Sequence, residues 1–206
     1  MSSRLLQEFK KLQRDETSVV DEVCLFPHDN VCCWRMKMRD FVEDTSDAQL
    51  LREDLAELKR RFGGDGKIHM ELNFSSRYPI EPPMIRVVSP RMLQYTGNVT
   101  IGGAVCSEFL LAGGKYDPDF EISEIMRMVR LNMLTAPKVV VTTQFGPGGR
   151  AGPLRVDLNG RDHLGSPLRE YSRTSAESSL RRAIAHHQEN GWWYLEHKDF
   201  REKHKY

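Results

Sequence analysis

Hydrophobic residues recur along the chain with two periods, and these periods predict its secondary structure. Spacings of three and four residues are typical of helices that bury one face, and alternation is typical of half-buried strands. In one segment Trp34, Met36 and Met38 alternate with charged neighbours, so we expect a sheet with one packed face and one solvated face. Helices are predicted over residues 3–14, 47–62, 120–134 and 174–189, and strands over 18–26, 31–39, 67–74, 84–88 and 139–145.

Glycine, proline and capping residues mark the ends of several of these elements. The run Gly63-Gly64-Asp65-Gly66 ends the second helix. Thr174 and Glu177 have the spacing of a capping box, which predicts the start of the last helix. Residues 89–119 show no clear period, and residues 146–167 contain six glycines and three prolines, which is typical of a long loop.

A run of strands with helices before, within and after it favours the α+β class. We therefore expect a four-stranded antiparallel meander flanked by helices. The length fits a single domain over residues 1–206. Within it we expect a core of about 1–145, a Gly/Pro-rich insertion at 146–167 and a C-terminal helix at about 174–190.

Composition excludes several classes of function. The chain has 30 Lys and Arg against 29 Asp and Glu, and this net charge of +1 argues against a nucleic-acid-binding protein. No apolar run is long enough to cross a membrane, and the first residues lack the apolar core of a signal peptide. The expected location is therefore the cytoplasm, the nucleus or both. The cysteines lack the CxxC spacing of a zinc site, so no metal is expected; they are Cys24, Cys32, Cys33 and Cys106.

Candidate chemistry gathers between residues 78 and 106. Tyr78-Pro79-Ile80-Glu81-Pro82-Pro83 places three prolines in five residues, which from the residues alone predicts a rigid turn. Cys106 follows a run of small residues beginning at Gly102 and Gly103, which would let a partner backbone approach. An isolated cysteine is most often a buried inert thiol, and a reactive thiolate is the alternative.

In their order along the chain, several motifs resemble the ubiquitin-conjugating enzyme family, and its Q-type branch above all. The resemblance covers most of residues 1–145 and resumes at about 174–193. The motifs that carry it are the basic first helix, the inserted helix at 50–59, Leu72-Asn73-Phe74-Ser75, Tyr78-Pro79-Ile80-Glu81-Pro82-Pro83, Val87-Val88-Ser89-Pro90, the segment from Gly102 to Leu110 with its cysteine, Gln144-Phe145-Gly146 and the closing segment from His187 to Trp192.

This resemblance implies an enzyme that receives ubiquitin on Cys106 as a thioester and passes it to lysine amines. A thiolate suits both steps, because it is a strong nucleophile and a good leaving group. The implied partners are ubiquitin or a ubiquitin-like modifier, an activating enzyme, a ligase and protein substrates. No cofactor is implied, since ATP is used by the activating enzyme.

The sequence departs from the family at the His-Pro-Asn tripeptide, whose place is taken by Thr96-Gly97-Asn98. Asn98 keeps the family's position, eight residues before Cys106. Its amide could stabilise an oxyanion or hold the local loop, and a plain turn residue is the other interpretation. Glu108, Asp117 and Asp119 are acids that could help a lysine nucleophile to lose its proton, and solvation or capping of the following helix is the other interpretation. For Asp119 we favour capping of that helix.

The resemblance also implies two docking surfaces. The basic face of the first helix would meet the activating enzyme, although a solvated face is an equally common use of such a helix. Ile80 and Pro118 match positions that contact ligases. The basic residues are Arg4, Lys10, Lys11 and Arg14.

A non-catalytic variant of the same fold that binds ubiquitin or a ligase is the main alternative function. The missing histidine and proline favour it, and the presence of Cys106 argues against it. The third interpretation is an interaction domain in which Cys106 has no chemical role. The sequence does not identify the modifier, ligase, substrate, chain linkage or oligomeric state.

Overall fold

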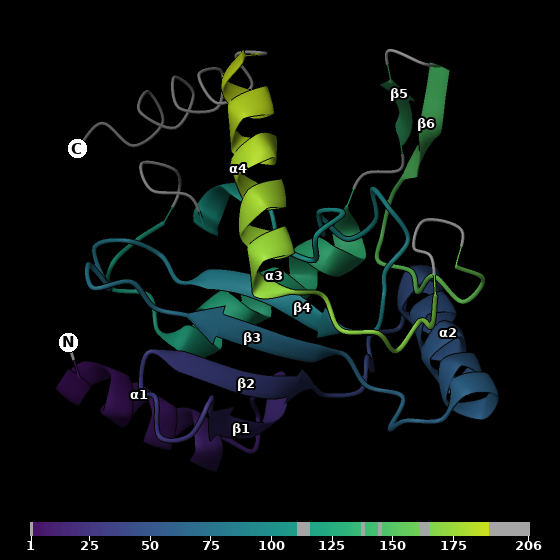
Figure 1. Cartoon of the computed structure of the whole chain (residues 1–206). Coiled ribbons are helices and arrows are strands. Elements are labelled where there is room, and N and C mark those ends of the chain that lie inside the picture. The colour runs from purple at the N-terminus through teal and green to yellow at the C-terminus, as the bar shows by residue number, and fades with distance from the viewer. Residues whose placement is uncertain (1, 111–115, 137–138, 144–145, 161–164, 190–206) are drawn as a thin grey trace.

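A four-stranded antiparallel sheet forms the centre of the molecule (Figure 1). Its strands lie in the order of the chain, and each pairs with the next, which confirms the α+β class and the predicted meander. The strands are β1 (Val20–Leu25), β2 (Cys33–Met38), β3 (His69–Asn73) and β4 (Met84–Ser89). The computed structural model describes residues 2–110, 116–136, 139–143, 146–160 and 165–189.

Four helices surround this sheet among the described residues, with α3 crossing behind it in Figure 1. Helix α1 lies beside β1, α2 lies beyond one end of the strands, and α4 rises steeply from the β4 side. None of the described helices has the length and apolar character needed to span a membrane. The helices are α1 (Ser2–Arg14), α2 (Ser46–Phe62), α3 (Ile122–Thr135) and α4 (Arg173–Glu189).

The alternation read from the sequence sets the packed face of the sheet. Fully burying one such apolar side chain contributes about 1.5–3 kcal/mol, so this face provides much of the driving force for folding. Its buried residues include Trp34, Met36, Met38, Met70, Leu72, Ile85 and Val87, joined in one cluster by Ile125, Met126 and Val129 from α3.

The opposite face is not fully solvated, and in this respect the prediction is wrong. Glu71 and Arg86 lie on it and are both buried, because residues 171–173 cross over them on the way into α4. Cys33 at the start of β2 is covered in the same way, with the guanidinium of Arg173 3.2 Å from its sulfur.

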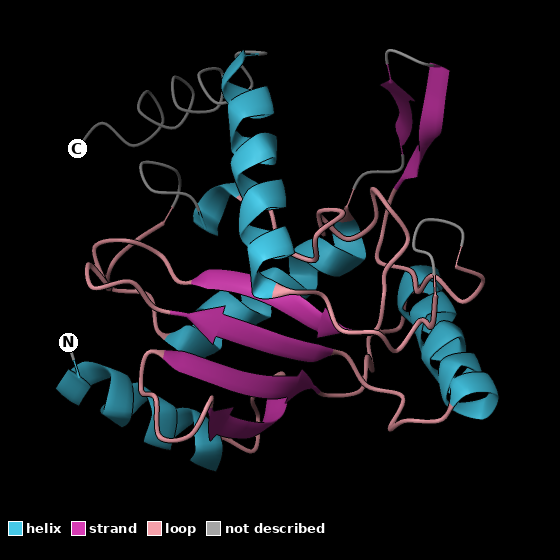
Figure 2. Ribbon diagram, in the orientation of Figure 1, coloured by secondary structure: helices cyan, strands magenta, loops and turns pink. Residues whose placement is uncertain are grey.

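The segment after α3 is more ordered than its composition predicts. A ribbon of β5 (Val139–Thr143) and β6 (Gly146–Ala151) projects away from the sheet (Figure 2). The following residues return to the core, where Leu154 and Val156 are buried. The expectation of a loop throughout 146–167 is therefore wrong for this part. The end predicted for the β5 segment, residues 144–145, and the closing motif beyond residue 189 lie outside the described residues.

Side-chain caps define two helix starts. Thr45 caps α2 by accepting a hydrogen bond from the amide of Ala48, and α2 ends at Gly63 with a φ of 82°. Helix α4 begins before the predicted capping box. Its capping side chain is Ser172, whose hydroxyl accepts from the amide of Ser175 at 3.1 Å, so the prediction of Thr174 as cap is wrong.

Candidate functional site

Cys106 ends a short hairpin that begins at Asn98. The amide of Cys106 donates to the carbonyl of Asn98 at 2.8 Å, and Val99 pairs with Val105. The amide of Thr100 donates to the carbonyl of Ala104, also at 2.8 Å. These bonds fix the backbone on which the thiol stands.

The tip of this hairpin is packed against the chain itself. A Cβ added to Gly102 would overlap the carbonyl of Ser175 and the hydroxyl of Ser179, both on α4. Gly103 has a φ of 92° and faces the ring of Tyr171. The expectation that these glycines admit a partner backbone is thus wrong, because Ser175 and Ser179 of α4 and the ring of Tyr171 occupy that space.

The thiol of Cys106 is partly shielded from solvent but is not fully buried. The residue is half-buried, and burial raises the pKa of its thiol. Burial of this kind keeps the thiol protonated at neutral pH and lowers its reactivity until a base or a partner intervenes. Of the other cysteines, Cys24 is exposed and Cys32 half-buried, whereas burial raises the pKa of Cys33 to about 11.

Asn98 holds the hairpin through its backbone. Its φ of 55° lies in the left-handed region, which asparagine tolerates better than most residues. Its side-chain amide points to the C-terminal end of α3, where the carbonyl of Asn132 lies 3.5 Å away. This contact is long for a hydrogen bond, so the backbone geometry favours the interpretation of Asn98 as a turn residue.

The acidic residues after the cysteine organise the start of α3. The carboxylate of Asp117 accepts from the amide of Asp119 at 2.9 Å. The cap of α3 is Glu121, whose amide donates to the carboxylate of Glu124 at 2.9 Å. The prediction that Asp119 caps this helix is therefore wrong.

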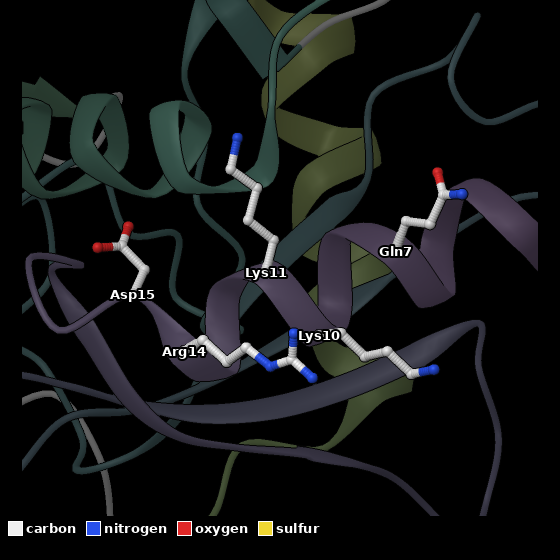
Figure 3. A pocket seen from close by; sticks show the side chains of 5 residues that line it. All are labelled: Gln7, Lys10, Lys11, Arg14 and Asp15. Carbon is white, nitrogen blue, oxygen red and sulfur yellow. The ribbon is translucent and has the colours of Figure 1, made fainter.

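The four basic residues of α1 divide into two pairs. Lys11 extends toward α3 (Figure 3) and its ammonium lies 2.6 Å from the Glu121 carboxylate. Arg4 contacts Glu8 and the carbonyl of Pro118, each at 2.8 Å. Lys10 and Arg14 are exposed and, with Gln7, Lys11 and Asp15, line an open hollow of about 530 Å³.

Arg4 and Glu8 bring together the two loops predicted to contact ligases. Glu8 accepts from the Tyr78 hydroxyl at 3.0 Å and from the amide of Ile122 at 3.0 Å. Arg4 lies over the Tyr78 ring and holds the carbonyl of Pro118. Ile80 therefore projects, 67% exposed, from a loop anchored to the same helix as the Pro118 loop.

A buried charge cluster on the far side of the sheet was not found from the sequence. Glu71 is fully buried and binds Arg35, Arg86 and Arg173, which come from β2, β4 and the start of α4. Each of these residues alone resembles a solvated strand or helix residue. Only the pairing register, with Glu71 opposite both Arg35 and Arg86, could have indicated the cluster.

Within the described part of the chain, no three His, Cys, Asp or Glu side chains lie close enough to hold a metal ion.

Comparison with known proteins finds similarity to the same family that the sequence motifs resemble. No protein-family model matches the sequence. The chain is 25% identical over 193 residues to "Ubiquitin-conjugating enzyme E2 Q1" of Mus musculus and of Homo sapiens, which covers 93% of this chain. It is 26% identical over 165 residues to a Q-like ubiquitin-conjugating enzyme protein of Mus musculus, covering 80% of this chain and 83% of that protein.

The chain resembles the Q-type ubiquitin-conjugating enzymes. A further relative, "Ubiquitin-conjugating enzyme E2 25" of Caenorhabditis elegans, is 25% identical over 93% of this chain and 43% of its own length. The chain spans 39% of the length of the Q1 relatives. The α+β fold with its four-stranded meander agrees with this Q-type resemblance.

Proposed function

We propose that this chain is a ubiquitin-conjugating enzyme that carries ubiquitin, or a ubiquitin-like modifier, as a thioester on Cys106. It then transfers the modifier to lysine amines together with a ligase. The observation that carries this proposal is the half-buried thiol at the end of a hydrogen-bonded hairpin, in a chain with Q-type relatives. The reaction uses no cofactor on this chain, and its location is the cytoplasm, the nucleus or both.

The proposed chemistry is two successive acyl transfers. The Cys106 thiolate attacks the carbonyl carbon of the modifier's thioester on the activating enzyme, and that enzyme's cysteine leaves as a thiolate. A lysine amine then attacks the new thioester, Cys106 leaves as a thiolate, and the amine gives up a proton as the amide forms. Because burial raises the pKa of the Cys106 thiol, the thiol must first lose its proton before it can accept the acyl group of the modifier.

The docking surfaces in this proposal follow the exposed side chains. Lys10 and Arg14 present their exposed positive charge to the activating enzyme, while Arg4 and Lys11 are held by contacts within the chain. Ile80 and Pro118 are exposed and form the contact with a ligase. Neither nucleic acid nor a membrane is a partner in this proposal.

A loading assay tests the function. The protein is incubated with activating enzyme, ATP and ubiquitin, and compared on reducing and non-reducing gels. We expect an adduct that disappears on reduction and does not form with Cys106→Ala, while Cys24→Ala loads as the wild type does. Absence of an adduct with ubiquitin and with several ubiquitin-like modifiers would overturn the enzymatic proposal and favour a binding protein of the same fold.

A pair of variants at Asn98 separates its two interpretations. Asn98→Gly removes the amide but tolerates the positive φ, so we expect normal loading and discharge to free lysine within about twofold of wild type. Asn98→Ala removes the amide and also places a residue that disfavours the positive φ, so we expect a loss of about 1 kcal/mol of stability in urea unfolding. Normal loading with discharge slowed about a hundredfold in Asn98→Gly would instead assign the amide to oxyanion stabilisation.

A further inference from the structure

Helix α4 rests on the hairpin that ends at Cys106. At the contact, Gly102 leaves no space for a side chain against Ser175 and Ser179, and Gly103 is covered by the ring of Tyr171. Glycine is needed wherever two backbones come this close. The hairpin tip and the first turns of α4 therefore form one packed unit.

A chain of hydrogen bonds runs through this unit. The amide of Ala104 donates to the Thr100 hydroxyl at 3.0 Å, and that hydroxyl lies 2.7 Å from the Ser179 hydroxyl. Ser179 donates to the carbonyl of Ala176 at 3.0 Å, so Thr100 is the donor between the two hydroxyls. Ser179 is 3% exposed, and removal of its hydroxyl would leave the half-buried Thr100 hydroxyl without this acceptor.

The start of α4 is anchored on strands β3 and β4, in addition to its contact with the hairpin. Arg86 donates to the carbonyl of Tyr171 at 2.8 Å, and the amide of Tyr171 donates to the carbonyl of Val88 at 2.8 Å. Arg173 binds the Glu71 carboxylate at 2.9 Å. Since α4 is fixed to strands β3 and β4, it can transmit that rigidity to the hairpin it touches.

We propose that α4 positions the thiol of Cys106, and that Thr100 and Ser179 are positioning residues for acyl transfer. This inference rests on the proposed function, because positioning matters only if the thiol reacts. Ala104, held by Thr100, is two residues from Cys106, whose own amide is bound to Asn98. Strand β4 also holds this segment, since the amide of Val87 donates to the carbonyl of Gly103 at 2.8 Å and the amide of Val105 donates to the carbonyl of Ile85 at 2.9 Å. Loosening the hydroxyl pair therefore shifts the hairpin on that support, exposes the thiol and misplaces it for a bulky thioester partner.

The test compares Ser179→Ala with a matched control, Ser178→Ala, whose hydroxyl is bonded to the exposed Arg182. One readout is the rate of Cys106 alkylation by iodoacetamide at several pH values, followed by mass spectrometry. The other is the rate of ubiquitin loading. In Ser179→Ala we expect Cys106 to be alkylated roughly fivefold faster, because one lost hydrogen bond of about 1 kcal/mol makes the opened hairpin about fivefold more populated. We also expect the pH profile of alkylation to move to lower pH, because a more exposed thiol has a lower pKa. We expect loading to become slower, and Ser178→Ala to match wild type in both.

Two variants of Thr100, the other hydroxyl of the pair, test the same contact without changing Ser179. Thr100→Ser keeps the hydroxyl and should behave as wild type, whereas Thr100→Val should reproduce Ser179→Ala. Alkylation profiles identical to wild type in folded Ser179→Ala and Thr100→Val would overturn the positioning role. If the wild type fails to load any modifier, the proposed function fails, while the alkylation profiles still decide whether α4 controls the thiol.

Discussion

Replacing Glu71 with glutamine is expected to destabilise the fold by about 3–5 kcal/mol, because it leaves buried arginine charge without a counterion. The Arg86 guanidinium binds both carboxylate oxygens of Glu71, at 3.0 and 2.8 Å, and its side chain is 4% exposed. Arg35 and Arg173 add bonds of 3.0 and 2.9 Å. Urea unfolding at neutral pH, followed by fluorescence, measures the loss.

The same carboxylate gives the stability a defined dependence on pH. Burial by itself raises the pKa of Glu71, but the hydrogen bonds and charge of Arg86 outweigh it and hold the pKa at about 2, below the ordinary 4.5. A carboxylate whose pKa is lower in the folded state stabilises the fold at pH values above its pKa in the unfolded chain. This stabilisation is lost as the pH falls from about 4.5 toward 2. The difference between wild type and Glu71→Gln should therefore shrink by about 3 kcal/mol over that window.

Glu170→Gln is the matched control for this prediction. Glu170 binds the same Arg35 at 3.3 Å, but its side chain is 57% exposed. Exposed pairs contribute less than about 1 kcal/mol, so the control should unfold close to wild type at every pH. Equal stability of Glu71→Gln and Glu170→Gln at neutral pH would show that the buried cluster does not hold the strands and α4 together.

The elements of the core could be predicted because their patterns are local. Trp34, Met36 and Met38 alternate within one strand, and the run at Gly63 ends α2 where expected. Strand β6 could not be predicted, since its glycines and prolines have low strand propensity and only pairing with β5 makes it a strand. Leu154 and Val156 were likewise hidden within a stretch whose composition is that of a loop.

For the candidate site, the sequence indicated the residues but not what surrounds them. The resemblance to the ubiquitin-conjugating family indicated Cys106 and Asn98, and the structure joins these two residues by a backbone hydrogen bond. The contact of Gly102 with α4 joins residues far apart in the sequence, so no local pattern indicates it. The division of the basic α1 face depends in the same way on distant partners, since Lys11 meets Glu121 only in the folded chain.

Asp54→Ala is expected to cost about 2–3 kcal/mol, because three hydrogen bonds to one buried carboxylate are lost. Asp54 lies on α2 and accepts from two nitrogens of Arg155, at 2.6 and 2.8 Å, and from the amide of Val156 at 3.1 Å. Without it the Val156 amide is buried and unpaired, whereas the Arg155 guanidinium, 36% exposed, can turn to solvent. That difference limits the cost to less than we expect for Glu71.

The measurement is urea unfolding combined with hydrogen exchange at the amides of residues 154–157. Faster exchange is expected at the Val156 amide above all, because this amide donates to Asp54, whereas the amides of Leu154 and Asp157 donate to the carbonyls of Met133 and Arg91. Glu53→Ala is the control: Glu53 is the next residue on α2 and pairs only with the exposed Gln49 among its described hydrogen bonds. If both variants exchange at the wild-type rate, the buried side chains of Leu154 and Val156 and the backbone bonds of the segment hold it without Asp54, and the inserted helix is not required for its return to the core.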